Sequence, residues 1–152
     1  MFFTAHLAAG LIIGKLTDNY TASLVAAMGP DLDHAISYIR SGVLFRPREF
    51  LRTVATTEDP VGDQRNFLHN IGSFVAVTAA AFLFEIQLGW TVGLSYLSHL
   101  VLDVLDKADF YPFYPSMRFK LQGPIKYFSR EETLVTVLLF LVYFWLLLPT
   151  TA

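Results

Sequence analysis

Residues 71–90 read IGSFVAVTAAAFLFEIQLGW, a run in which Glu85 and Gln87 are the only strongly polar side chains. A helix that crosses the hydrocarbon core of a bilayer needs about 20 predominantly apolar residues. A second run, Thr133 to Leu148, carries no charge and reaches that length with its flanks. The two runs predict membrane-spanning helices and exclude a soluble enzyme.

The composition of the whole chain also favours an integral membrane protein. The chain has 152 residues, of which 54% are hydrophobic and 16% are charged, whereas soluble domains average about 25% charged residues. The net charge of -2 gives no reason to expect nucleic acid as a partner. Cysteine is absent, so a bound metal must be held by imidazole and carboxylate groups. The length predicts a single integral membrane domain, residues 1–152.

Three further apolar stretches are shorter: Phe2–Leu16, Tyr20–Met28 and Thr91–Leu105. Turn-forming residues 17–19 separate the first two, and residues 89–91 separate the long run from the third. The pattern predicts antiparallel helix hairpins within an all-α, polytopic transmembrane helical bundle of about four to five membrane helices. Residues 34–65 and 106–132 are expected to form polar loops.

The four histidines of the chain, His6, His34, His69 and His99, are expected to lie at the same end of this bundle. The first helix begins near His6, and the second returns to that side just before His34. His69 precedes the third helix, and His99 lies in the later half of the fourth. An up-and-down topology therefore places a polar metal site near one membrane face.

The basic residues predict the orientation of the bundle. Ten of the eleven lysines and arginines lie on the histidine side, and only Lys15 lies on the other. The positive-inside rule then places the site and the basic loops on the cytoplasmic side of a multi-pass protein of the cell membrane, with the C-terminus outside. Basic loops of this kind attract anionic lipid headgroups, although topology-setting charge explains them equally well. The ten residues are Arg40, Arg46, Arg48, Arg52, Arg65, Lys107, Arg118, Lys120, Lys126 and Arg130.

Two short segments combine histidine with aspartate. His99 and Asp103 are four residues apart, which on a helix places both side chains on one face, as two ligands of one ion require. Asp31, Asp33 and His34 follow a Gly-Pro break and offer two carboxylates and an imidazole. The alternatives are a polar helix end for the first segment and a solvated turn for the second.

The two remaining histidines also have two interpretations. His6 is either a ligand or an interior histidine, and His69 is either a ligand or a helix cap beside Arg65. Arg65 can instead bind a substrate phosphate through its forked guanidinium. We expect Asp31, Asp33 and Arg65 to form the catalytic set, and a divalent metal, zinc before others, at about one to three ions. The predicted metal ligands are His6, Asp31, Asp33, His34, His69, His99 and Asp103.

Four motifs in this order resemble the small membrane-bound metal-dependent hydrolases of the YdjM type. They are Thr4-Ala5-His6, Gly29-Pro30-Asp31-Leu32-Asp33-His34, Arg65-x-x-x-His69 and Ser98-His99-Leu100-Val101-Leu102-Asp103, and the resemblance runs from Met1 to about Pro115. It implies helical architecture, two or three zinc ions and phosphoester substrates, through a distant likeness to zinc-dependent phospholipase C and P1-type nucleases. The third motif departs from the family pattern, because Gln64 stands where the family has histidine and Leu68 where it has threonine.

The sequence therefore predicts a membrane-embedded metal-dependent hydrolase of phosphoesters such as phospholipids or lipid phosphates, with membrane lipid as its partner. The metal would polarise a phosphoryl oxygen and lower the pKa of a bound water from about 15.7 toward 7. The alternative is a non-enzymatic membrane protein that uses the same cluster for structural metal binding or ion handling. A catalytic site keeps an open position, whereas a structural site is closed by protein.

Overall fold

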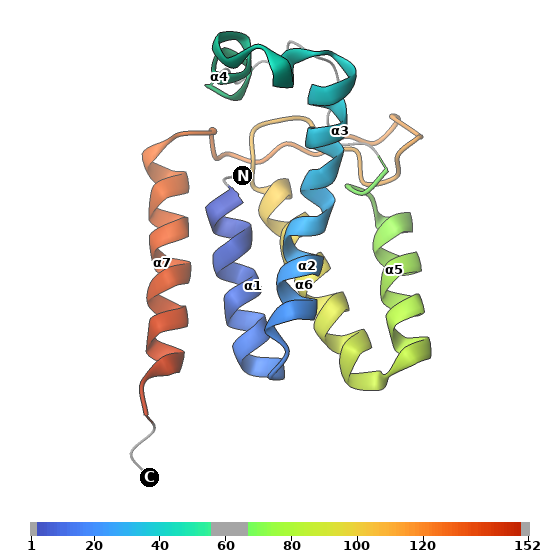
Figure 1. Ribbon diagram of the computed structural model, residues 1–152, viewed down its shortest axis with the longest axis vertical. Coiled ribbons are helices and arrows are strands. Elements are labelled where there is room, and N and C mark those ends of the chain that lie inside the picture. The colour runs from blue at the N-terminus through green and yellow to red at the C-terminus, as the bar shows by residue number, and fades with distance from the viewer. Residues whose placement is uncertain (1–2, 56–66, 150–152) are drawn as a thin grey trace.

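The computed structural model describes residues 3–55 and 67–149, and in these ranges the fold is all-α, as predicted. Two isolated β-bridges in the loop after residue 105 are the only β structure of the described residues. Two helix hairpins and one further helix form the bundle, in which α7 packs against α1 and the hairpins pack through α2 and α6 (Figure 1). The elements are α1 (Phe3–Thr17), α2 (Tyr20–Met28), α5 (Ile71–Phe84), α6 (Ile86–Val104) and α7 (Arg130–Leu147).

The first hairpin turns where the sequence predicts, at Asp18 and Asn19. Asp18 adopts a left-handed conformation with a φ of 54°, which aspartate tolerates better than most residues. Asn19 caps α2, because its side-chain oxygen accepts a hydrogen bond from the backbone N–H of Ala22 at 3.1 Å. The hydroxyl of Ser23 on α2 donates to the carbonyl of Gly10 on α1 at 2.7 Å and joins the two helices.

The second hairpin turns earlier than the predicted position at residues 89–91. The chain breaks at Glu85, which is extended, with φ -161° and ψ 140°, and separates α5 from α6. Gly89 lies inside α6 against Phe82, and a Cβ placed there would come within 2.2 Å of the phenyl ring. Gly89 therefore allows two helices to approach closely and does not form a turn.

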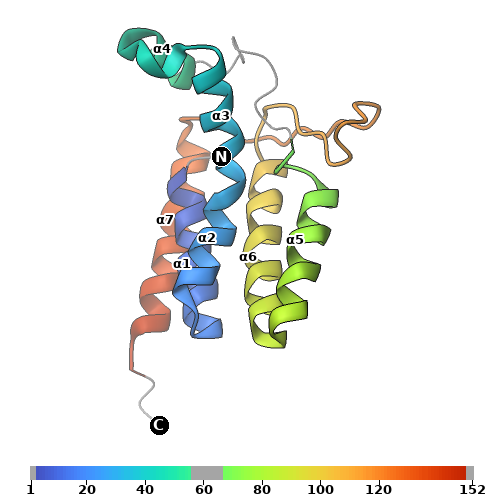
Figure 2. The ribbon, with the colours of Figure 1, turned by 45° about the vertical axis from the view of Figure 1, so that its right-hand side comes forward.

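The segment after α2 was predicted as a loop, but it contains two more helices. A short 3₁₀ turn, η1 (Gly29–Asp31), leads into α3 (Leu32–Arg40). A second turn, η2 (Val43–Phe45), follows Gly42, whose φ of 71° suits glycine, and leads into α4 (Pro47–Ala55). Figures 1 and 2 both show α4 beyond the ends of the longer helices, above the bundle.

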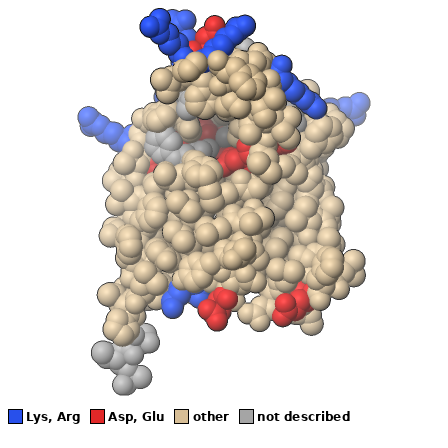
Figure 3. Space-filling view, in the orientation of Figure 1, with Lys and Arg blue, Asp and Glu red and all other residues tan. Residues whose placement is uncertain are grey.

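The side chains in the interior of the bundle are mostly small or polar, and those on its outer surface are mostly large and apolar. Alanines fill much of the interior, together with buried hydroxyls such as those of Ser23 and Ser95, which lie 2.7 Å apart between α2 and α6. The outward faces of α5 and α7 expose large side chains such as Phe84 and Trp145. Figure 3 shows a broad band of this surface without basic or acidic side chains. In the part of the chain that the structure describes, no helix has the length and apolar character needed to cross a membrane.

Candidate metal centre

One end of the bundle gathers histidine and aspartate side chains from four separate segments. The predicted convergence of the four histidines is what the structure shows, with the rings of His6 and His99 stacked at a centroid distance of 3.9 Å. The rings of His34 and His69, and those of His69 and His99, have centroids 5.0 Å apart. The donors are His6 on α1, Asp31 on η1, His34 on α3, His69 before α5, and His99 and Asp103 on α6.

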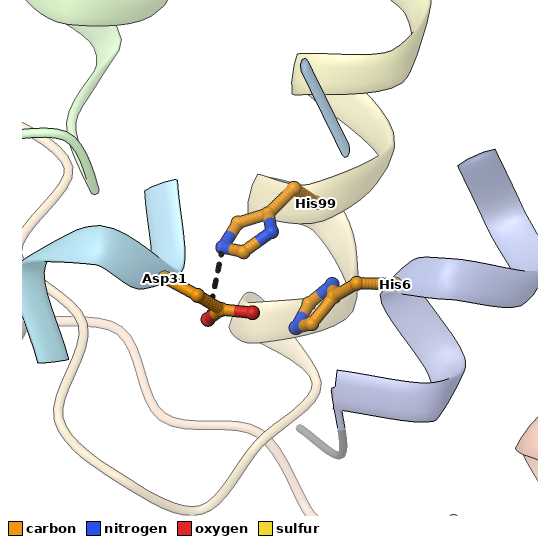
Figure 4. A group of neighbouring side chains, drawn as sticks. All are labelled: His6, Asp31 and His99. Atoms are coloured by element: carbon orange, nitrogen blue, oxygen red, sulfur yellow. Dashed lines mark ion pairs between the residues drawn. The ribbon is translucent and has the colours of Figure 1, made fainter. Parts of the chain in front are cut away.

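These residues form three overlapping sets, each able to offer three donor atoms within 4.8 Å of one another. Asp31, His69 and His99 each belong to two of the sets. Figure 4 shows one set, in which Asp31, His6 and His99 point toward one another from three different elements. The sets are His6–Asp31–His99, Asp31–His34–His69 and His69–His99–Asp103.

The hydrogen bonds of two histidines fix which ring nitrogen is available. Nδ1 of His99 lies 2.7 Å from the carbonyl oxygen of Ala27, which can only accept, so this nitrogen carries the hydrogen. Nδ1 of His69 lies 3.2 Å from the carboxylate of Asp33 and carries a hydrogen for the same reason. Both rings are therefore left with an Nε2 lone pair for a metal, which is the usual arrangement around metal-bound histidine.

The Nε2 atoms of His69 and His99 face each other at a distance of 3.1 Å. This distance shows whether the two nitrogens can be ligands of the same cation. Two lone pairs at this distance repel unless a proton or a metal ion lies between them. Ligands held at about 2.0–2.1 Å by a tetrahedral zinc ion lie about 3.3 Å apart. An oxygen of Asp103 lies 3.4 Å from Nε2 of His69 and 3.6 Å from Nε2 of His99. The donor atoms of this set therefore have the spacing of ligands of a single ion.

His6 and Asp31 add buried polar atoms without a hydrogen-bond partner in the described residues. Both ring nitrogens of His6 and Oδ2 of Asp31 are in this state. Nε2 of His6 lies 3.4 Å from the carboxylate of Asp103. Burial raises the pKa of Asp31, and the charge of Asp103 raises it further, while His6 and His69 act in the opposite direction. Buried polar groups left unsatisfied are costly, so a cation bound among them would satisfy the cluster.

Asp33 lies behind the cluster, on the outer side of His69. One oxygen of its buried carboxylate lies 3.2 Å from Nδ1 of His69 and accepts a hydrogen bond from the backbone N–H of Leu68 at 2.6 Å. None of the three donor sets of the described residues includes Asp33. The structure therefore gives the two aspartates of the Asp31-Leu32-Asp33 motif different positions: Asp31 faces the donors, and Asp33 orients one of them.

The centre is closed on most sides and opens toward α3. The side chains of His69 and His99 are 0% exposed and that of Asp103 is 2% exposed, whereas those of His34 and Asp31 are 27% and 21% exposed. Figure 3 shows the surface hollowed beneath the α3 and α4 segment, with acidic side chains at the hollow. Among the described donors, His34 and Asp31 are therefore the most accessible to a ligand.

The aromatic, proline-rich segment 110–115 packs beside the His69 segment. The carbonyl of Pro112 accepts a hydrogen bond from the backbone N–H of Ile71 at 2.9 Å, and the rings of Tyr114 and Phe67 meet edge to face at 5.4 Å. The hydroxyl of Tyr96 on α6 donates to the carbonyl of Leu68. These contacts fix the backbone that carries His69.

Glu132 and Tyr127 are two polar residues near the centre that were not predicted to have a role. Glu132 is fully buried at the start of α7, where its carboxylate accepts a hydrogen bond from the backbone N–H of Phe128 at 2.7 Å. Burial raises the pKa of Tyr127 to about 12, with the nearby charge of Glu132 as the next cause. The signal in the sequence was the Ser129-x-x-Glu132 capping pattern, which precedes the apolar run.

Arg65 and Gln64, singled out by the sequence, lie outside the described residues.

Comparison with known families gives one match that spans nearly the whole chain. The family model described as YdjM inner membrane protein matches residues 2–151. Comparisons with curated proteins and with solved structures give no match.

Proposed function

Because this chain belongs to the YdjM inner membrane protein family, we propose that it is a membrane-embedded, metal-dependent hydrolase of phosphoesters such as phospholipids or lipid phosphates. The observation that carries the proposal is the pair of Nε2 lone pairs of His69 and His99, which face each other at 3.1 Å beside Asp103. An arrangement of this kind needs a proton or a metal ion between the two nitrogens. Histidine and carboxylate donors are the ligand set of hydrolytic zinc sites.

The distribution of side chains supports a multi-pass arrangement. The outer faces of α5 and α7 are apolar, and the interior holds the polar groups, as expected for a bundle surrounded by hydrocarbon. Exposed apolar patches of this extent mark contact with lipid or with another protein. Lysine and arginine gather at the end that holds the cluster, which favours a cytoplasmic site.

A divalent cation held by His6, Asp31, His34, His69, His99 and Asp103 would supply Lewis-acid polarisation of a phosphoryl oxygen and a more acidic water. The residues around it divide the remaining work. His99 is held by the carbonyl of Ala27 and His69 by Asp33, so both rings keep one orientation. These fixed orientations favour preorganised catalysis over a loose binding site.

Asp31 is the residue that we assign to proton transfer. Its Oδ2 has no hydrogen-bond partner in the described residues, and its side chain lies at the exposed edge of the cluster. One oxygen of this carboxylate can hold the cation while Oδ2 takes a proton from water and returns it to a leaving group. Arg65, outside the described residues, is proposed from the sequence to neutralise the substrate phosphate.

Hydrolysis in a defined bilayer tests the proposal. The protein is placed in nanodiscs that contain phosphatidic acid or phosphatidylglycerol, and the release of phosphate or headgroup is followed with a chelator and after divalent metal is restored. Release should require metal and be lost in Asp31→Asn. Asp109→Asn is the matched control, because Asp109 pairs with Lys120 at 3.2 Å outside the cluster.

The same experiment distinguishes an enzyme from the alternative, a non-enzymatic protein that binds metal at this cluster. A protein that binds metal at the cluster but releases nothing from any phosphoester would be better explained by a structural or ion-handling site. The partly exposed side chains of Asp31 and His34 favour the enzyme, because a structural site is closed on all sides.

A further inference from the structure

The helix α3 presents an unusual division of its faces. Successive residues of an α-helix are rotated by about 100°, so Leu32, Ile36 and Ile39 share one face. All three are exposed to solvent in the isolated chain. His34 and Tyr38 lie on the opposite face, toward the metal centre, with their rings 6.5 Å apart. The apolar side of this helix therefore faces outward, and its polar side faces the protein.

The segment that follows α3 continues the outward apolar surface. Phe45 in η2 is 75% exposed and Leu51 in α4 is 67% exposed. Phe50, next to Leu51, turns the other way and meets the ring of Tyr38 edge to face at 5.4 Å. This contact attaches α4 to α3, so residues 32–55 form one unit, which we call the α3–α4 arm.

The arm also carries most of its charge as arginine. Arg40, Arg46, Arg48 and Arg52 are exposed, and Figure 3 shows basic side chains gathered at this end of the molecule. The exposed acid of the arm is Glu49, which pairs with Arg46 at 3.0 Å. On α4, Arg48 and Arg52 lie about 60° and about 100° from Leu51 around the helix axis, so the two arginines border the apolar position. An amphipathic segment with an apolar face and flanking arginines is the type that lies in the interface of an anionic membrane.

We propose that the α3–α4 arm docks on the surface of an anionic phospholipid bilayer. Leu32, Ile36, Phe45 and Leu51 enter the outer part of the acyl-chain region, and the arginines meet the phosphates. The arm extends from η1 and carries the exposed edge of the metal centre, formed by Asp31 and His34, to the depth of the headgroups. This docking concerns the surface of the arm and does not require the centre to be catalytic.

Site-specific labelling tests the docking directly, because the chain has no native cysteine. A polarity-sensitive fluorophore is attached to Leu51→Cys in nanodiscs of phosphatidylcholine with phosphatidylglycerol, with and without a nitroxide on the acyl chains. The expected result is blue-shifted emission that the nitroxide lipid quenches. Glu49→Cys, on the opposite face of the same helix, is the matched control and should show neither effect.

Charge is tested in the same label background. Arg48→Glu with Arg52→Glu should move the Leu51 label back toward water and reduce its quenching. Residue 48 lies in the first turn of α4, where a negative side chain is favoured, so this helix should remain folded. Nanodiscs of phosphatidylcholine alone should reproduce the effect of the double substitution.

Two results would overturn the docking. In the first, the Leu51 label behaves like the Glu49 label and the nitroxide lipid quenches neither. In the second, the Leu51 label is shielded from water but insensitive to nitroxide lipid, so that another protein surface covers the arm. Metal content and phosphoester hydrolysis are measured in the same discs. If the Leu51 label is not quenched but hydrolysis is intact, only the docking of the arm is refuted. If the label is quenched but no phosphoester is hydrolysed, only the proposed enzymatic function is refuted.

Discussion

Asp33 and His69 are paired on the outer side of the metal centre, with a carboxylate oxygen 3.2 Å from Nδ1 of the ring. The opposite nitrogen of the same ring faces His99 and Asp103. The same oxygen of Asp33 also accepts the backbone N–H of Leu68, so it holds both the ring and the backbone that carries it. The pair connects α3 to the segment before α5 and orients one donor without adding another.

This pairing predicts the effect of Asp33→Asn. The amide keeps the shape but removes the charge that orients the imidazole and raises its basicity. Metal affinity should therefore fall by about 10–100-fold without being abolished. Titration with a competing chelator measures the change, and Asp109→Asn should leave the affinity unchanged. An affinity equal to that of the unaltered protein would mean that Asp33 does not position His69.

Asp31→Asn should change the stability of the protein in opposite directions with and without metal. Burial raises the pKa of Asp31 in the folded state, so the folded chain holds this proton more tightly than the unfolded chain. The stability that the protonated group contributes is present below the unfolded pKa of about 3.9 and is lost as pH rises through the folded pKa. In chelator at neutral pH, the asparagine variant should therefore unfold at a higher temperature, and the difference should shrink as pH falls.

With metal added, the order should reverse. The metal stabilises the folded chain according to its affinity, and the variant lacks an anionic donor shared by two of the donor sets. Thermal unfolding in detergent at two pH values, with chelator and with metal, measures both differences. If the unaltered protein is the more stable one even in chelator, the burial of Asp31 is not a cost in the metal-free state.

Gly89→Ala should destabilise the second hairpin. The added methyl group would overlap the ring of Phe82, and an overpacked interior of this kind typically costs about 1–3 kcal/mol. Ala80→Leu adds more atoms at an exposed position of α5 and should change the free energy of unfolding by less than about 0.5 kcal/mol. Denaturation in detergent compares the two variants. Equal free energies of unfolding for the two variants would indicate that the hairpin turns at a residue other than Glu85.

The orientation is predicted from the basic residues. Ala152→Cys should react with an impermeant maleimide added outside intact cells, and Ser41→Cys, at an exposed position after α3, should react only after the cells are opened. Labelling of residue 152 from the cytoplasmic side alone would contradict the number of crossings or their direction.

Part of the fold and of the site could be predicted from short stretches of sequence. The first hairpin and the convergence of His6, His69 and His99 follow from apolar runs and turn residues. The break at Glu85 was missed because Gly89 looks like a turn residue in sequence, whereas its role is close packing against Phe82. Spacing alone cannot show such a contact between neighbouring helices.

The helices α3 and α4 and the roles of the two aspartates needed the structure for a different reason. The apolar positions of α3 face outward, so the helix did not stand out as part of a packed core. Asp31 and Asp33 differ by two residues, and only the path of η1 into α3 turns one carboxylate toward the donors and the other toward Nδ1 of His69. Glu132 was missed because the last helix was expected to begin at Thr133, whereas it begins at Arg130.

The metal content of the purified protein tests the central claim most directly. Elemental analysis of detergent-purified protein, normalised to protein concentration, should find divalent metal at about one ion per chain or more, and His99→Ala should lose most of it because Nε2 of this residue belongs to two donor sets. Asp109→Asn should keep the full content. A folded protein without divalent metal, even after metal is supplied, or a His99→Ala variant with the content of the unaltered protein, would contradict the assignment of this cluster as a metal centre.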